Sequence, residues 1–149
     1  MDFAQLLGKK LKDDLLLEIF AQYDIDVVYD FDKTHENMED HYWAAAPKHG
    51  FQFRFNQAQL LDVIFLYMVP REGFTPIDKA EIDVPIYASF TEAKQALEHN
   101  GIAFTQSPVE DPNSTWFQRW IKANHGAYTA HYEFKDQQLR MITLSLPNE

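Results

Sequence analysis

Two histidines and a glutamate, His35, Glu36 and His41, are the first residues whose types could support metal chemistry. A zinc-protease helix places its two histidines four residues apart, so that both lie on one face. Here they are six residues apart, so they would not share a helix face and the motif is absent. A site made of His35, His41 and His49 remains conceivable, because His41 and His49 flank an expected strand. We nevertheless predict no metal and no cofactor.

Nucleophilic catalysis has little support in the sequence. The chain has no cysteine, which excludes thiolate nucleophiles, thiolate zinc sites and disulfides. Ser89 is better explained as a helix cap, and no Gly-x-Ser-x-Gly motif occurs. The five glycines form no phosphate-binding loop. We therefore predict that the chain is not an enzyme. The alternative is a small enzyme or small-ligand-binding α+β domain with a pocket near His131 and Trp120.

Composition limits the partners that the chain can have. Its 149 residues fit one domain, residues 1–149, and its formal charge is −10. Nucleic acids and anionic membrane surfaces would repel such a charge, so we expect neither as a partner. The first ten residues lack the order of charges and apolar residues of a signal peptide, and no run is long enough to span a membrane. We expect a cytoplasmic protein.

The elements that could position any site begin with two strands. Residues 51–55 alternate phenylalanines with polar residues, which predicts a half-buried strand. Residues 60–69 are apolar on both faces, which predicts a strand covered on both sides. Residues 56–59 would join them as a hairpin at the centre of an antiparallel sheet. Further short strands are expected at residues 27–29 and 42–46.

Helices are predicted before and after these strands. Residues 2–23 read as helix, with a second helical segment beginning at Asp13 or Asp14. Residues 89–100 form the clearest helix, because Ser89 and Glu92 make a capping box and Gly101 follows as a stop. Residues 115–146 read as a three-stranded meander, and we see no repeat in the sequence. The predicted fold is α+β, an antiparallel sheet with the N-terminal and central helices packed on one face.

The order of these parts resembles a known group of proteins. The residues that carry the resemblance are Leu6-Leu7-Gly8, His41-Tyr42-Trp43, Gly50-Phe51-Gln52-Phe53, Val63-Ile64-Phe65-Leu66-Tyr67, the helix after Ser89 and a Trp-rich end closing with Met141-Ile142-Thr143-Leu144. The chain resembles the small cytoplasmic immunity proteins that protect bacteria from polymorphic toxins of type VI secretion, Rhs and contact-dependent systems. The resemblance implies a non-enzymatic inhibitor that binds one cognate toxin domain and blocks or deforms its active site. It carries over no functional residue.

An acidic segment is the predicted contact with such a toxin. Residues 24–40 hold seven acids and the single base Lys33, a net −6 out of the total of −10. Toxins that attack nucleic acids often have basic clefts, so an acidic inhibitor would associate faster. The competing interpretation is a solvated surface segment. The predicted contact residues are Asp24, Asp26, Tyr29, Asp30, Phe31, Asp32, Glu36, Glu39, Asp40 and Tyr42, with Glu110 and Asp111 in a second patch on the loop 107–113.

Overall fold

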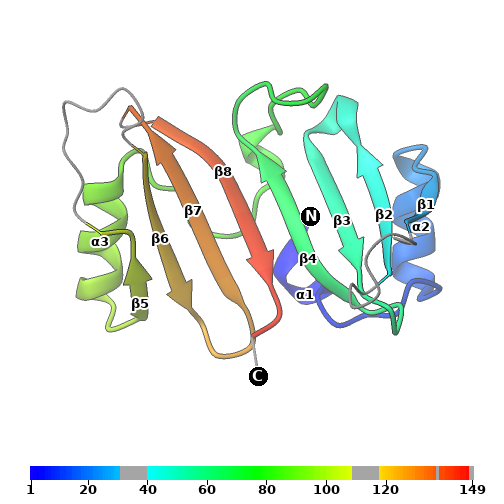
Figure 1. Cartoon of the computed structure of the whole chain (residues 1–149), viewed down its shortest axis with the longest axis horizontal. Coiled ribbons are helices and arrows are strands. Elements are labelled where there is room, and N and C mark those ends of the chain that lie inside the picture. The colour runs from blue at the N-terminus through cyan, green and yellow to red at the C-terminus, as the bar shows by residue number, and fades with distance from the viewer. Residues whose placement is uncertain (31–39, 109–117, 137, 148–149) are drawn as a thin grey trace.

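The computed structural model describes residues 1–30, 40–108, 118–136 and 138–147. These residues form one eight-stranded antiparallel sheet, three α-helices and two short 3-10 helices (Figure 1). The prediction of an α+β chain built on an antiparallel sheet is therefore confirmed. Across the sheet the strands follow the order β1-β2-β3-β4-β8-β7-β6-β5.

The elements agree closely with the predicted strands and helices where both exist. The helices are α1 (Phe3–Leu6), α2 (Asp14–Gln22) and α3 (Phe90–His99), and the 3-10 helices are η1 (Pro47–His49) and η2 (Lys79–Glu81). The strands are β1 (Val27–Asp30), β2 (His41–Ala46), β3 (Phe51–Phe55), β4 (Leu61–Tyr67), β5 (Ala103–Gln106), β6 (Gln118–Asn124), β7 (Thr129–Lys135) and β8 (Gln138–Ser145). The predicted meander corresponds to β6, β7 and β8, and its first residues, 115–117, lie outside the described residues.

The N-terminal segment folds as two helices for reasons visible in its sequence. The Asp13 carboxylate accepts a hydrogen bond from the Leu15 backbone N–H at 2.9 Å, which satisfies one of the free N–H groups at the start of α2. The apolar stripe of α2 buries Leu16, Ile19 and Phe20. Both the break near residue 13 and the stripe were predicted.

The hairpin of β3 and β4 is present, but it is not the centre of the sheet. Its turn closes through a hydrogen bond from the Asn56 N–H to the Leu60 carbonyl at 2.9 Å, with Gln59 at a φ of 64°. The middle of the eight strands is instead the antiparallel pair β4 and β8. β4 can occupy this place because five of its seven residues are buried. The sequence shows that β4 is covered, but not which strand lies beside it.

The core is formed where aromatic rings from the helices meet one set of strand residues. Phe3 of α1 lies 5.5 Å from Phe51, and Phe20 of α2 lies 6.3 Å from Phe55, between ring centroids. Antiparallel partners point to the same face, so the register places Phe51 in one row with residues of four other strands. The row is Phe51, Leu66, Ile142, Tyr132 and Ile121. All five of its side chains are buried.

The central helix α3 is positioned by the capping box that the sequence predicts. The Glu92 N–H donates to the Ser89 hydroxyl at 3.1 Å, and the Glu92 carboxylate accepts from the Ala88 N–H at 3.0 Å. Gly101 follows with a φ of +66°, which a glycine adopts without steric cost. The chain then enters β5, a strand that was not predicted. Its four residues carry no clear alternation of buried apolar side chains, and its burial pattern is only exposed and half-buried.

The order of elements is repeated in the structure, although no repeat is seen in the sequence. α2 followed by β1 to β4 has the same element order as α3 followed by β5 to β8, and corresponding elements begin 76 to 78 residues apart. The helix ends also match, because the Ile25 N–H donates to the Phe20 carbonyl at 2.8 Å and the Ile102 N–H donates to the Leu97 carbonyl at 2.9 Å. Figure 1 shows α2 and α3 at opposite ends of the sheet. The repeat was missed because the two halves share burial and turns rather than residue identities.

Candidate protein-binding surface

The predicted contact residues that the structure describes gather at one end of the sheet. Asp24, Asp26 and Asp30 are exposed in and just before the edge strand β1, and Asp40 and Tyr42 lie at the start of the neighbouring strand β2. The register brings these segments together, since Tyr29 pairs with Tyr42. The other predicted contacts lie outside the described residues. They are Phe31, Asp32, Glu36, Glu39, Glu110 and Asp111.

One hydrogen bond links the two strands within this group. The Tyr29 hydroxyl donates to the Asp40 carboxylate at 2.5 Å, and the Tyr29 ring lies 4.8 Å from that of Tyr42. The hydrogen bond to Asp40 is the main cause that raises the pKa of Tyr29 to about 12. Tyr29 therefore stays neutral at physiological pH, and the negative charge of this group resides on its carboxylates.

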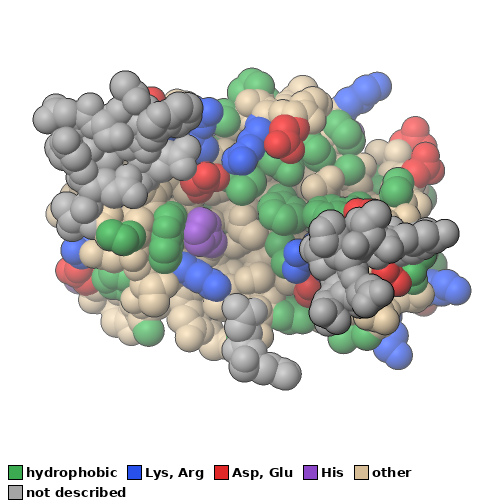
Figure 2. All heavy atoms as spheres, viewed as in Figure 1, with side chains coloured by type: hydrophobic (Ala, Val, Ile, Leu, Met, Phe, Trp, Pro, Cys, Tyr) green, Lys and Arg blue, Asp and Glu red, His purple; other side chains and the backbone are tan. Residues whose placement is uncertain are grey.

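Exposed hydrophobic residues mark the same end of the molecule. The large hydrophobic side chains that are exposed in the described part of the chain belong to α2 and β1 alone: Leu15, Leu17, Val27, Val28 and Tyr29, each 40 to 59% exposed. Residues 13–30 also contain six acids and no lysine or arginine, although Lys12 directly precedes them. We call the exposed side chains of residues 13–30 the α2–β1 surface. Figure 2 shows acidic and hydrophobic side chains together at this end.

Of the hydrophobic residues of this surface only Tyr29 was among the predicted contacts, although the sequence of α2 also carries a signal for Leu15 and Leu17. Once Leu16, Ile19 and Phe20 form the buried stripe of α2, Leu15 and Leu17 must lie on its two flanks, because successive residues turn by about 100°. Leu15 borders a hollow shared with α1, so Leu17 lies on the flank that faces away from α1. Two leucines beside a complete apolar stripe thus indicate an exposed patch.

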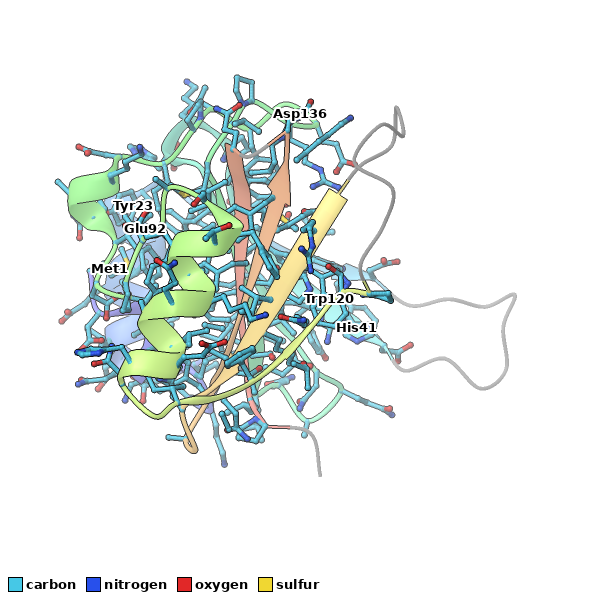
Figure 3. All side chains as sticks on the ribbon, turned by 90° about the vertical axis from the view of Figure 1, so that its left-hand side faces the viewer. Met1, Tyr23, His41, Glu92, Trp120 and Asp136 are labelled. Atoms are coloured by element: carbon cyan, nitrogen blue, oxygen red, sulfur yellow. The ribbon has the colours of Figure 1, made fainter. Side chains whose placement is uncertain are left out.

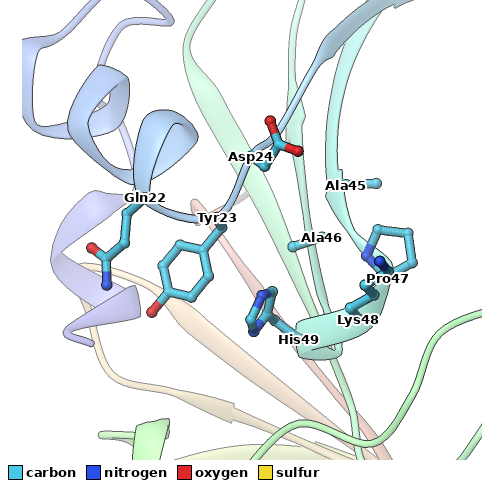
Figure 4. A pocket seen from close by; sticks show the side chains of 8 residues that line it. All are labelled: Gln22, Tyr23, Asp24, Ala45, Ala46, Pro47, Lys48 and His49. Carbon is cyan, nitrogen blue, oxygen red and sulfur yellow. The ribbon is translucent and has the colours of Figure 1, made fainter.

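Three adjoining hollows meet at Tyr23, at the end of α2. One of them, of about 360 Å³, is lined by Gln22, Tyr23, Asp24, Lys48, His49 and neighbouring β2 residues (Figure 4). The Tyr23 hydroxyl donates to the Glu81 carboxylate at 3.2 Å, and its ring lies edge-on to His49 at 4.8 Å. Burial, followed by the nearby Glu81 charge, raises the pKa of Tyr23. A neutral phenol held by a carboxylate is not an activated nucleophile.

The conceivable histidine metal site is not assembled by the residues that can be placed. The His49 ring contacts Tyr23, whereas the His41 ring lies 6.4 Å from Trp43. Figure 3 shows Tyr23 and His41 on opposite sides of the sheet. Over the described ranges, no three His, Asp or Glu side chains form a group that could hold a metal ion. His35 lies outside those ranges.

The alternative site near His131 and Trp120 consists of a stacked pair in the middle of the sheet. The two rings lie 5.3 Å apart with an angle of 26° between their planes, on β7 and β6. Burial is the main cause that lowers the pKa of His131, while Glu133 raises it and Lys122 lowers it further. The three hollows at Tyr23 and a fourth beside β5 are lined by other residues. His131 is thus a neutral, stacked sheet residue.

Acidification is expected to destabilise the protein through His131. Its pKa in the folded chain lies below the reference value of 6.5, so the unfolded chain takes up a proton first. This contribution to stability is therefore lost as the pH falls from 6.5 toward the folded pKa. Urea unfolding measured from about pH 8 to about pH 5 should show a steeper loss in the wild type than in His131→Gln. Equal slopes would contradict this assignment.

Comparisons with known proteins add nothing to this geometry. In the part of the chain that the structure describes, no helix has the length and apolar character needed to cross a membrane. No family model, no curated protein and no solved structure matches the chain.

Proposed function

We propose that the chain is an immunity protein, a non-enzymatic inhibitor that binds and neutralises a cognate antibacterial toxin in the cytoplasm. The observation that carries the proposal is the α2–β1 surface. It combines five exposed acids, no basic residue and the exposed large hydrophobic side chains of the described chain. Charge of one sign beside apolar side chains is suited to binding a basic protein, because the charges speed association and the apolar area holds the complex.

The arrangement of the helices is consistent with a body that serves as a scaffold. We infer that the N-terminal and central helices form one layer on one face of the sheet. The contacts of Phe3 and Phe20 with β3, and of Phe90 with Phe134 of β7, support this, because those strand residues are all buried. In Figure 3, Met1, Tyr23 and Glu92 lie on one side of the sheet and Trp120 and His41 on the other. The α2–β1 surface is then presented at one end of a rigid sheet.

The test is protection of cells against the toxin encoded beside this gene. The toxin domain of the adjacent reading frame is expressed with and without this chain, and growth is measured. We expect growth only when the chain is present. If the adjacent product is not toxic, or if the chain does not restore growth, the immunity function is wrong.

Neutralising Asp26 and Asp30 together is expected to slow binding. Removing two surface charges that attract a basic partner should lower the association rate by about threefold to tenfold at low salt and flatten its salt dependence. Stopped-flow mixing of the chain with the toxin domain measures both effects for Asp26→Asn/Asp30→Asn.

A matched control removes the same charge from the other half of the molecule. Glu98 and Asp136 are exposed there, on α3 and in the turn between β7 and β8. Asp136 has a φ of 53°, which asparagine tolerates, so Glu98→Gln/Asp136→Asn keeps the fold. If the two double variants slow association equally, only the total charge matters and the α2–β1 surface is not the contact.

A further inference from the structure

The outer side of β1 is a strand edge that can accept another strand. Among the described strands β1 pairs only with β2, and it lies at the end of the sheet order. In an antiparallel pair, alternate residues direct their backbone N–H and C=O groups to the partner and the others direct them away. Half of the backbone groups of β1 therefore point away from β2. An edge of this kind is a template for a strand from another chain.

β1 is short and carries the charged Asp30, but it lacks other features by which proteins commonly protect such an edge. Its sequence Val27-Val28-Tyr29-Asp30 contains no proline and no lysine, and its register with β2 is continuous over four residue pairs without a bulge. All four of its side chains are exposed. The corresponding edge strand of the second half, β5, is half-buried at alternate positions and has no charged residue. The two edges have equivalent places in the fold and differ in exposure and charge.

The charges along the β1 edge determine which kind of strand can bind there. Val28 pairs with Trp43 and Asp30 with His41, so both side chains lie on the same face of the sheet. The two-residue repeat of a strand places Asp26 on that face as well. A second copy of this chain paired antiparallel about Val28 would bring Asp26 opposite Asp30, and like charges facing each other destabilise strand pairs. A strand with lysine or arginine opposite both aspartates would be stabilised instead.

We propose that β1 binds an extended basic segment of the partner as an additional strand of the sheet. Lysine or arginine of that segment lies opposite Asp26 and Asp30, and an apolar residue lies opposite Val28. This inference rests on the proposed function for the identity of the partner. The proposed strand pairing depends on the β1 edge alone, so a synthetic peptide strand can test it.

The probe is a disulfide-cyclised hairpin peptide whose outer strand reads Lys-Thr-Val-Thr-Lys, added at millimolar concentration to the isotopically labelled chain. Amide hydrogen exchange followed by NMR should slow by about tenfold or more at alternate β1 residues, where backbone groups gain a hydrogen bond. The β5 amides should not change. A peptide with glutamate in place of both lysines should give no protection.

Proline substitutions provide a second test that depends on the backbone alone. Of Val27→Pro and Val28→Pro, one removes an N–H that points away from β2 and the other removes an N–H that bonds to it. The first should keep the thermal stability near that of the wild type and abolish protection by the lysine hairpin. The second should lower stability.

The outcomes separate this inference from the proposed function. Failure of the lysine hairpin to protect β1, equal protection by the glutamate peptide, or full protection in the fold-preserving proline variant would each overturn strand addition. Self-association of the chain through β1 would overturn it too, since a second copy of the chain would then occupy the edge. None of these results involves the toxin, so the growth assay and the Asp26→Asn/Asp30→Asn kinetics still decide the proposed function.

Discussion

Gly50→Ala is expected to lower the free energy of unfolding by about 3 to 5 kcal/mol, a loss typical of severe steric changes. Gly50 has a φ of +74°, and a Cβ there would lie 2.3 Å from the Ile77 nitrogen and 2.5 Å from the Thr75 carbonyl oxygen. These backbone atoms cannot simply move aside. The Thr75 N–H donates to the Pro47 carbonyl at 2.9 Å, and the Ile77 N–H donates to the Tyr67 carbonyl at 2.8 Å. The methyl group must therefore displace a hydrogen-bonded segment.

The repeat supplies a matched control for this substitution. His125-Gly126 follows β6 as His49-Gly50 follows β2, and Gly126 has a φ of +85° with no atom within 4 Å of an added Cβ. Gly126→Ala should lower the free energy of unfolding by only about 1 kcal/mol, the cost of placing alanine in a left-handed backbone conformation. Thermal unfolding followed by circular dichroism should show a melting temperature about 10 °C lower for Gly50→Ala and only a few degrees lower for Gly126→Ala. Equal losses would mean that the segment around Thr75 yields easily.

Phe53→Ala is expected to lower the free energy of unfolding by about 3 to 5 kcal/mol, as large-to-small changes in cores do. Phe53 is fully buried, and its ring lies 5.3 Å from Phe51, 6.4 Å from Phe3 and 6.5 Å from Phe20. The cavity would thus open beneath both N-terminal helices. Because Phe20 holds α2 against β3, we also expect weaker binding to the proposed toxin partner, through a less fixed α2–β1 surface.

Phe65→Ala is the corresponding control on the opposite face of the same sheet. Phe65 is only half-buried and stacks on Trp43 at 6.1 Å. It should cost about 1 to 2 kcal/mol, since less apolar area is lost. Urea unfolding of both variants measures the difference, and unchanged m-values would show that both still unfold in one step. A larger loss for Phe65→Ala would contradict this assignment, because the main core would then lie on the face that carries Phe65.

The elements with strong local signals could be predicted from the sequence. The capping box at Ser89 and Glu92, the alternation of residues 51–55 and the stripe of α2 each depend on residues that are near one another in the chain. The pairing of β4 with β8 could not be predicted, because it joins residues about eighty positions apart and neither strand carries a signal for its neighbour. β5 was missed because Phe104 is the one large apolar residue among its four, so its sequence shows no apolar alternation.

For the α2–β1 surface, the sequence predicted the acidic segment but not the exposed leucines and valines. Counting acids identified Asp26 and Asp30, and the structure places them around one exposed strand. Val27 and Val28 looked like ordinary strand residues, since a β-branched pair is more often buried than exposed. Only the sheet order reveals that, among the strands the structure describes, this one has a neighbour on one side alone.

The two halves of the sheet assign stability and binding specificity to different residues, whereas a small protein usually uses the same residues for both. Ile64 pairs with Leu144 and Leu66 with Ile142. The two strands that join the halves therefore contribute the same two residue types, isoleucine and leucine, to these pairs. This joint is formed entirely by inner strands, far from the outermost residues 26–30. Substitutions in residues 26–30 can therefore change binding specificity without altering the sheet. For the proposed inhibitor, such substitutions would be enough to keep binding a partner whose surface changes.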